Sequence, residues 1–126
     1  MDVTQTHGAF SWNELMTPDP AAAARFYSEM FGWQVKDPIP EMGDYRVASL
    51  GDDMVAGIMA PAPGSPPMPP HWGSYITVAD TDRAAERAVA LGGKVLLPPI
   101  DVPTVGRMAV LQDPQGAVFS VMKYSG

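Results

Sequence analysis

The sequence contains no cysteine. Disulfide bridges, thiolate metal sites and a cysteine nucleophile are therefore excluded as explanations of its fold or chemistry. Basic residues are also few, because eight Lys and Arg are scattered along the chain against fourteen Asp and Glu, for a formal net charge of −6. Since clustered Lys and Arg side chains bind the phosphates of nucleic acids, this balance argues against a nucleic-acid partner.

Long apolar runs are absent as well. The longest apolar stretches are far too short to cross a bilayer, and the opening MDVTQTHGAF has neither the basic start nor the apolar run of a signal peptide. We therefore expect no membrane partner and a cytoplasmic location. The 126 residues are 46% hydrophobic and 17% charged, which is the composition of a single globular domain.

The chain contains the same pattern twice, in TPDPAAAARFYSEMFGWQV and in VADTDRAAERAVALGGKVL. Each copy places an aspartate where a helix N-cap belongs and ends the helix at a glycine. Asp19 and Asp80 are 61 positions apart, as are Gly32 and Gly93. The spacing of apolar residues predicts a core-facing stripe on each helix, formed in the first by Ala23, Phe26, Tyr27, Met30 and Phe31 and in the second by Ala84, Ala85, Ala88, Val89 and Leu91.

Strand patterns surround both helices. Residues 8–15 and the segment WQVKD read as strands, and DYRVASLG with DMVAGIMA reads as a hairpin turning at Gly51, Asp52 and Asp53. Residues 61–70 contain six prolines and are expected to be a spacer. After the spacer the order repeats, with strands in WGSYITV, KVLLPPI, GRMAVLQD and GAVFSVMKY.

Each half therefore reads strand, helix, strand, strand, strand. We predict an α+β domain over residues 1–126, with two tandem βαβββ modules at 8–60 and 71–124. Such units, which cannot bury their faces alone, would form one curved mixed sheet with the helices on one face and a concave ligand cavity on the other.

This arrangement resembles the vicinal oxygen chelate superfamily, which includes glyoxalase I, bleomycin-resistance proteins and extradiol dioxygenases. The resemblance spans nearly the whole chain and rests on WNELMTPDPAAAARFYSEMFGWQV, WGSYITVADTDRAAERAVALGGKV and LQDPQGAVFSVMK. The opening Ser11-Trp12-Asn13-Glu14 is similar to that of a glyoxalase-like subgroup.

The resemblance also implies where metal ligands would lie. In metal-dependent members they come from the first and last strands of each module, which here correspond to Trp12, Met59, Gly73 and Ser120. Trp and Gly offer no ligand atom, Met is soft, and Ser is a poor ligand for Zn, Ni, Fe or Mn. We therefore expect no metal and no cofactor at this place. A relocated metal site built from Glu14, His71 and His7 is the alternative.

Strand alternation predicts the cavity wall. The expected ligand-binding residues are Trp12, Met16, Tyr45, Met59, Gly73, Tyr75, Thr77, Ser120 and Met122, with Val118 on the same face. Glu14 shares that face and is the candidate catalytic residue, because burial would raise its pKa toward that of a general acid or base. A structural or ligand-anchoring role for Glu14 is the competing interpretation. Arg46 and Arg107 are interpreted as solvated edge charges.

The predicted function is binding or sequestration of a small organic molecule by a metal-free homodimer. The dimer is expected because an open sheet with Met, Trp and Tyr on its inner face would expose much apolar surface. The first alternative is a glyoxalase-like enzyme (a lyase, isomerase or hydroxylase) that uses a relocated metal or Glu14. The second is a structural or regulatory dimer whose cavity is filled by its own side chains.

Overall fold

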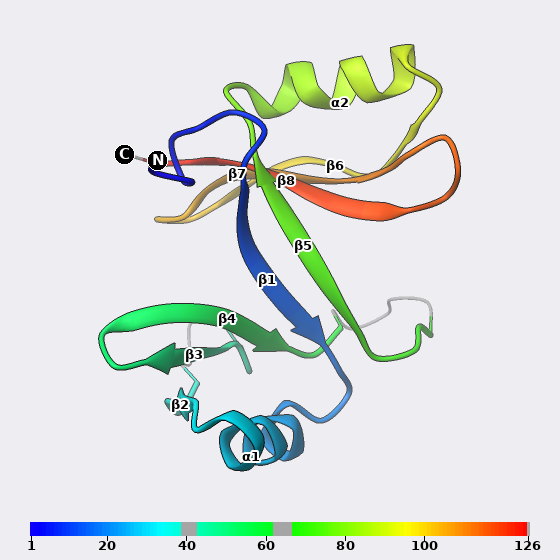
Figure 1. Ribbon diagram of the computed structural model, residues 1–126. Coiled ribbons are helices and arrows are strands. Elements are labelled where there is room, and N and C mark those ends of the chain that lie inside the picture. Colours follow the sequence, from blue (N-terminus) through cyan, green and yellow to red (C-terminus); the bar gives the residue numbers. More distant parts are fainter. Residues whose placement is uncertain (39–42, 62–66, 126) are drawn as a thin grey trace. The chain divides into compact units, whose positions relative to one another are not determined.

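The structure is a computed structural model that describes residues 1–38, 43–61 and 67–125. The chain divides into two compact units. The α1 unit is Trp12–Gly73, and the α2 unit is Met1–Ser11 together with Ser74–Gly126. Figure 1 shows the elements of both units, and each is described by itself.

The described residues of the α1 unit form one helix and four strands. These are β1 (Phe10–Met16, whose first two residues belong to the α2 unit), α1 (Pro20–Phe31), β2 (Gln34–Val35), β3 (Arg46–Leu50) and β4 (Asp53–Met59). The strands lie in the order β2-β3-β4-β1. β3 is antiparallel to β2 and β4, and β1 is parallel to β4. The predicted hairpin is therefore β3–β4.

The α2 unit repeats this plan with β5 (His71–Thr77, whose first three residues belong to the α1 unit), α2 (Thr81–Ala90), β6 (Lys94–Val102), β7 (Gly106–Gln112) and β8 (Val118–Tyr124). Its strands lie in the order β5-β8-β7-β6, with β5 parallel to β8 and the other pairs antiparallel. α2 lies against β6, β7 and β8 (Figure 1). The predicted α+β class with two βαβββ modules and mixed strand directions is confirmed.

Both helices begin where the sequence predicts. The Asp19 carboxylate accepts a hydrogen bond from the Ala22 amide at 3.1 Å, and Asp80 accepts one from the Arg83 amide at 3.1 Å. α1 ends at Gly32, whose φ of 74° is the left-handed conformation that glycine adopts without strain. Neither described helix is long and apolar enough to cross a membrane.

The predicted helix stripes are partly wrong. In the core of the α1 unit, α1 contributes Ala24, which packs with Leu15 and Ile58, whereas Phe26, Met30 and Phe31 are 59%, 63% and 54% exposed. α2 likewise buries Ala85 and leaves Val89 and Leu91 exposed. The physical reason is that alanines bring each helix close to its sheet, so the larger side chains project beyond the contact.

Strand limits differ in detail from the prediction. β1 begins at Phe10 rather than at residue 8, and Gly8 and Ala9 instead exchange backbone hydrogen bonds with Thr77 at 2.8 Å each. β2 has two residues, and β3 starts at Arg46 rather than Tyr45. Residues 62–66 of the proline-rich spacer lie outside the described residues, so the proposed module boundaries stay a prediction.

Candidate functional site

The predicted site residues lie on the sheet faces turned away from the helices. Leu15 and Ile58 pack beneath α1, and Val78 and Val121 pack beneath α2. Because successive strand side chains point to opposite faces, the residues between them point away from the helices. In the α1 unit these are Trp12, Glu14, Met16 and Met59, and in the α2 unit they are Tyr75, Thr77, Ser120 and Met122.

In the α1 unit, the side chains of Trp12 and Glu14 form a hydrogen-bonded array with that of Tyr45. The Trp12 indole N–H donates to the Tyr45 hydroxyl at 3.2 Å, and that hydroxyl donates to Glu14 Oε2 at 2.7 Å. All three side chains are half-buried, so the array is fixed in place and still open to solvent. The short distance to Glu14 is that of a charge-assisted O–H···O⁻ hydrogen bond. The Trp12–Tyr45–Glu14 array therefore presents an indole and a carboxylate in fixed positions.

Gly57 makes room for this array. It lies on β4 opposite Glu14 of β1. A methyl group at Gly57 would overlap the Tyr45 hydroxyl and would lie 3.3 Å from Glu14 Oε2. The sequence reasoning did not identify Gly57, since its role appears only when the side chain of Tyr45 is placed over the strand. A glycine inside a strand signals such a close approach in general terms.

In the α2 unit the predicted residues pair across two strands. Tyr75 is opposite Ser120, and Thr77 is opposite Met122. Thr77 is 3% exposed and its hydroxyl donates to the Val3 carbonyl at 2.6 Å, so the N-terminal segment covers it. Five of the nine ligand-binding candidates belong to the α1 unit (Trp12, Met16, Tyr45, Met59 and Gly73), and four belong to the α2 unit (Tyr75, Thr77, Ser120 and Met122).

The residues at the implied metal positions do not fit a divalent metal. The Trp12 indole nitrogen is a hydrogen-bond donor and has no lone pair for a metal, and Gly73 has no side chain. For the relocated alternative, the described ranges 1–38, 43–61 and 67–125 contain no group of three His, Asp or Glu side chains that could hold an ion. His71 Nδ1 lies 2.9 Å from the Pro69 carbonyl, and His7 Nδ1 accepts from the Ala79 amide at 3.0 Å.

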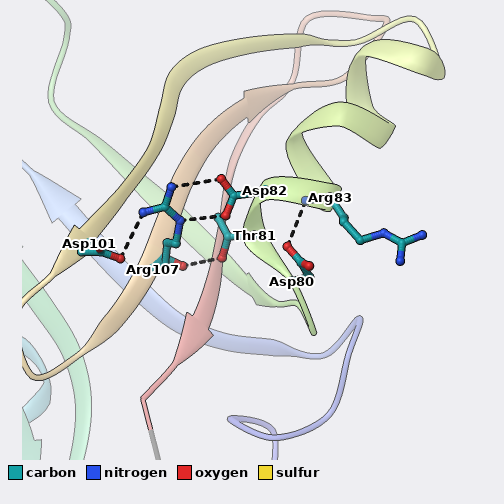
Figure 2. Close-up of polar contacts among 6 residues, drawn as sticks. All are labelled: Asp80, Thr81, Asp82, Arg83, Asp101 and Arg107. Atoms are coloured by element: carbon teal, nitrogen blue, oxygen red, sulfur yellow. Dashed lines mark hydrogen bonds and ion pairs between the residues drawn. The ribbon is translucent and has the colours of Figure 1, made fainter.

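Both arginines that were interpreted as solvated edge charges are ion-paired. Arg46 Nε lies 2.9 Å from Asp44. Arg107 contacts Asp82 at the start of α2 at 2.8 Å and Asp101 on β6 at 3.1 Å, as Figure 2 shows. The hydrogen bond from Arg107 lowers the pKa of Asp82, and the two carboxylates raise the pKa of Arg107. These arginines stabilise local structure rather than offer a free anion site.

A hollow of about 750 Å³ lies elsewhere, beside α2 on the helix-bearing face of the α2 unit. Its lining includes Ile76, Val78 and Val121, which alternate with the predicted site residues on β5 and β8. Ala84 and Ala88 of α2 also line the hollow. It is therefore a separate feature from the face that carries Tyr75 and Ser120.

The chain matches the family described as the Glyoxalase/Bleomycin resistance protein/Dioxygenase superfamily over residues 9–121. It belongs to this superfamily. The predicted resemblance is thereby confirmed for nearly the whole chain, and it agrees with the two βαβββ units described above.

Curated relatives carry two kinds of name. "Putative glyoxylase CFP32" of Mycobacterium tuberculosis and of Mycobacterium bovis is 45% identical over 117 residues, covering 92% of this chain and 44% of the relative. "Anthracycline biosynthesis protein DnrV" of Streptomyces peucetius is 36% identical over 131 residues, covering 92% of this chain and 47% of the relative. The chain thus spans less than half the length of these relatives.

Solved structures support the fold. Methylmalonyl-CoA epimerase from Mycobacterium tuberculosis has a TM-score of 0.63 at 16% identity, covering 94% of this chain and 89% of that one. A superfamily member from Vibrio splendidus has a TM-score of 0.58 at 16% identity, covering 90% and 97%. At these identities the likeness concerns the fold alone.

Proposed function

We propose that this superfamily member binds a planar organic small molecule at the Trp12–Tyr45–Glu14 array, without a divalent metal at the superfamily's usual metal position. The observation that carries the proposal is the array itself. It fixes an indole and a carboxylate side by side on a strand face that is still open to solvent. An indole face stacks on flat or cationic groups, and a carboxylate pairs with an amine.

The residues at the metal positions support the metal-free part of the proposal. Trp12 occupies the first position with a nitrogen that is committed as a donor to Tyr45. The indole would fill the volume that a metal and its waters need, and Met59 and Ser120 are weak ligands for the metals of this superfamily. The array would therefore recognise its ligand by stacking and hydrogen bonding.

The names of two relatives suggest a ligand class. Two Streptomyces relatives that are 36% identical to the chain are named for anthracycline biosynthesis. Anthracyclines combine fused planar rings with an amino sugar, which are the two features that an indole face and a carboxylate recognise. We therefore propose planar aromatic amines as the ligands, and sequestration of such compounds as the role.

The test is a fluorescence titration of the purified protein with an anthracycline. We expect saturable binding that weakens about tenfold in Trp12→Phe, which stacks through a smaller ring and loses the N–H donor to Tyr45, and in Glu14→Gln, which loses the carboxylate charge. The matched controls are Trp72→Phe and Glu29→Gln, which remove an indole and an exposed carboxylate outside the array. Absence of saturable binding, or equal weakening in the controls, would overturn the proposal.

A glyoxalase-like enzyme is the second candidate. Two observations favour it: the relatives named as glyoxylases, and the hydrogen bond that orients Glu14 for proton transfer. This candidate predicts turnover of a hemithioacetal that is lost in Glu14→Gln and kept in Glu29→Gln. Turnover only after addition of Zn²⁺, Ni²⁺, Mn²⁺ or Fe²⁺, together with loss in His71→Ala, would indicate the relocated metal site.

A further inference from the structure

The hollow beside α2 has the size of a small-molecule site. Its volume of about 750 Å³ lies within the range of roughly 300–1,000 Å³ that such sites occupy. α2 packs mainly on β6 and β7, and the hollow opens beside it, over Ile76 of β5 and over Phe119 and Val121 of β8. All the residues that line it belong to the α2 unit, so the hollow is a feature of that unit alone.

The floor of the hollow is apolar and continuous with the core of the α2 unit. Val78, Leu111 and Val121 are at most 7% exposed and belong to that core, and Phe119 packs against it. Ile76 and Phe119 are only half-buried, so they leave apolar surface open to solvent. An apolar chain lying on these two side chains would remove that surface from water, which favours binding.

Two arginines of α2 stand beside this floor. Arg83 and Arg87 both line the hollow, and they share one face of the helix because they are four residues apart. Both are exposed, and neither forms an ion pair with any residue that the structure describes. Figure 2 shows that the Arg83 guanidinium extends away from Asp82 and Arg107. Unlike the ion-paired Arg107, these two guanidinium groups are therefore available to an anion.

The two acidic residues at the hollow leave these guanidinium groups accessible. The Asp80 carboxylate caps α2 by accepting from the Arg83 amide, and the positive end of the helix dipole offsets its charge. Glu86 is exposed on the flank of the helix, and it pairs with neither arginine in the described part of the chain. Two accessible guanidinium groups beside an apolar floor complement a ligand with an anionic head and an apolar chain.

We propose that the hollow binds a long-chain fatty carboxylate, with its carboxylate between Arg83 and Arg87 and its chain along Ile76 and Phe119. A guanidinium fork matches the two oxygens of a carboxylate, and two forks one helical turn apart can reach the same head group. This site differs in its chemistry from the Trp12–Tyr45–Glu14 array, which offers a carboxylate and so selects the opposite charge. The proposal does not depend on the function proposed for that array.

The experiment is isothermal titration of the purified protein with dodecanoate at about pH 8, where its carboxylate is ionised, below the concentration at which it forms micelles. We expect saturable binding that weakens about three- to fivefold in Arg83→Gln and in Arg87→Gln, because each variant removes one solvent-exposed ion pair with the ligand. The double variant should weaken binding by about tenfold or more. Glu86→Gln should tighten it by about twofold, because a nearby like charge is removed.

Two further arms test the apolar floor and the location of the site. Octanoate should bind at least about tenfold more weakly than dodecanoate, because its shorter chain buries less apolar surface. Ile76→Ala should weaken dodecanoate binding about threefold for the same reason. Trp12→Phe, in the array, and Arg25→Gln, which removes an exposed arginine of α1, are the matched controls and should leave the affinity for dodecanoate unchanged.

Absence of saturable binding below the micelle concentration would overturn the proposal. Equal weakening by Arg25→Gln or by Trp12→Phe would also overturn it, as would an affinity that is unchanged in the double arginine variant. Cooperative thermal unfolding checks that each variant is folded. The arginine variants, whose side chains are exposed, decide alone if Ile76→Ala is not folded.

Discussion

Gly57→Ala is the substitution that tests the geometry of the array most sharply. The added methyl group would overlap the Tyr45 hydroxyl and lie 2.7 Å from Tyr45 Cζ, so the Tyr45 ring has to move. Moving the ring breaks its hydrogen bond to the Glu14 carboxylate. A hydrogen bond to a charged group contributes about 1.5–3 kcal/mol to stability. Replacing glycine by alanine in a strand returns about 0.5–1 kcal/mol. The expected net loss in the free energy of unfolding is therefore about 1–2 kcal/mol.

Urea unfolding followed by circular dichroism measures this loss, and a second background isolates its cause. In Tyr45→Ala the ring is absent, so Gly57→Ala should there be neutral or slightly stabilising. The anthracycline titration should weaken in Gly57→Ala as it does in Trp12→Phe. An equal cost of Gly57→Ala in both backgrounds, or no cost in either, would refute the reasoning that places Tyr45 over Gly57.

Four further outcomes follow from the structure. Asp19→Ala should lower the free energy of unfolding by about 1 kcal/mol in urea, because it removes the α1 cap, and Asp19→Asn should largely retain it. Gly106→Ala should cost about 2 kcal/mol or more, since a methyl group there would overlap the Lys123 carbonyl at a φ of 157°. Thr77→Val should make the N-terminal segment more sensitive to limited proteolysis, because it removes the hydrogen bond to the Val3 carbonyl. The hydrogen bond from Arg107 lowers the pKa of Asp82, so it stabilises the fold above the ordinary aspartate pKa of 3.8, and this stabilisation is lost as the pH falls below that value. Arg107→Ala should therefore reduce the loss of stability measured between about pH 4 and pH 2.

Local sequence signals are sufficient to predict the fold. Asp19 and Asp80 mark helix starts and Gly32 a helix end, because capping depends on short-range hydrogen bonds. The predicted burial of Phe26, Met30 and Phe31 was wrong, since apolar periodicity does not say how closely a helix approaches its sheet. Close approach is set by Ala24, whose small side chain gives a weaker signal than its neighbours.

The candidate site was predicted less completely. Strand alternation correctly places Trp12 and Glu14 on the face away from α1, because the period of two is a property of the backbone. It does not show that Tyr45 joins them, since Tyr45 precedes β3 and reaches Glu14 through its side chain. For the same reason Gly57 went unrecognised. Whether Trp12 and the other candidates contact a ligand stays a prediction.

The central claim is that a planar ligand is recognised by the array without a metal. Isothermal titration with an anthracycline, before and after exhaustive chelation and with metal content measured in both samples, tests it most directly. The account predicts the same affinity in both samples and metal far below one ion per chain. Loss of binding on chelation, with recovery on adding back stoichiometric Zn²⁺, Ni²⁺, Mn²⁺ or Fe²⁺, would contradict it.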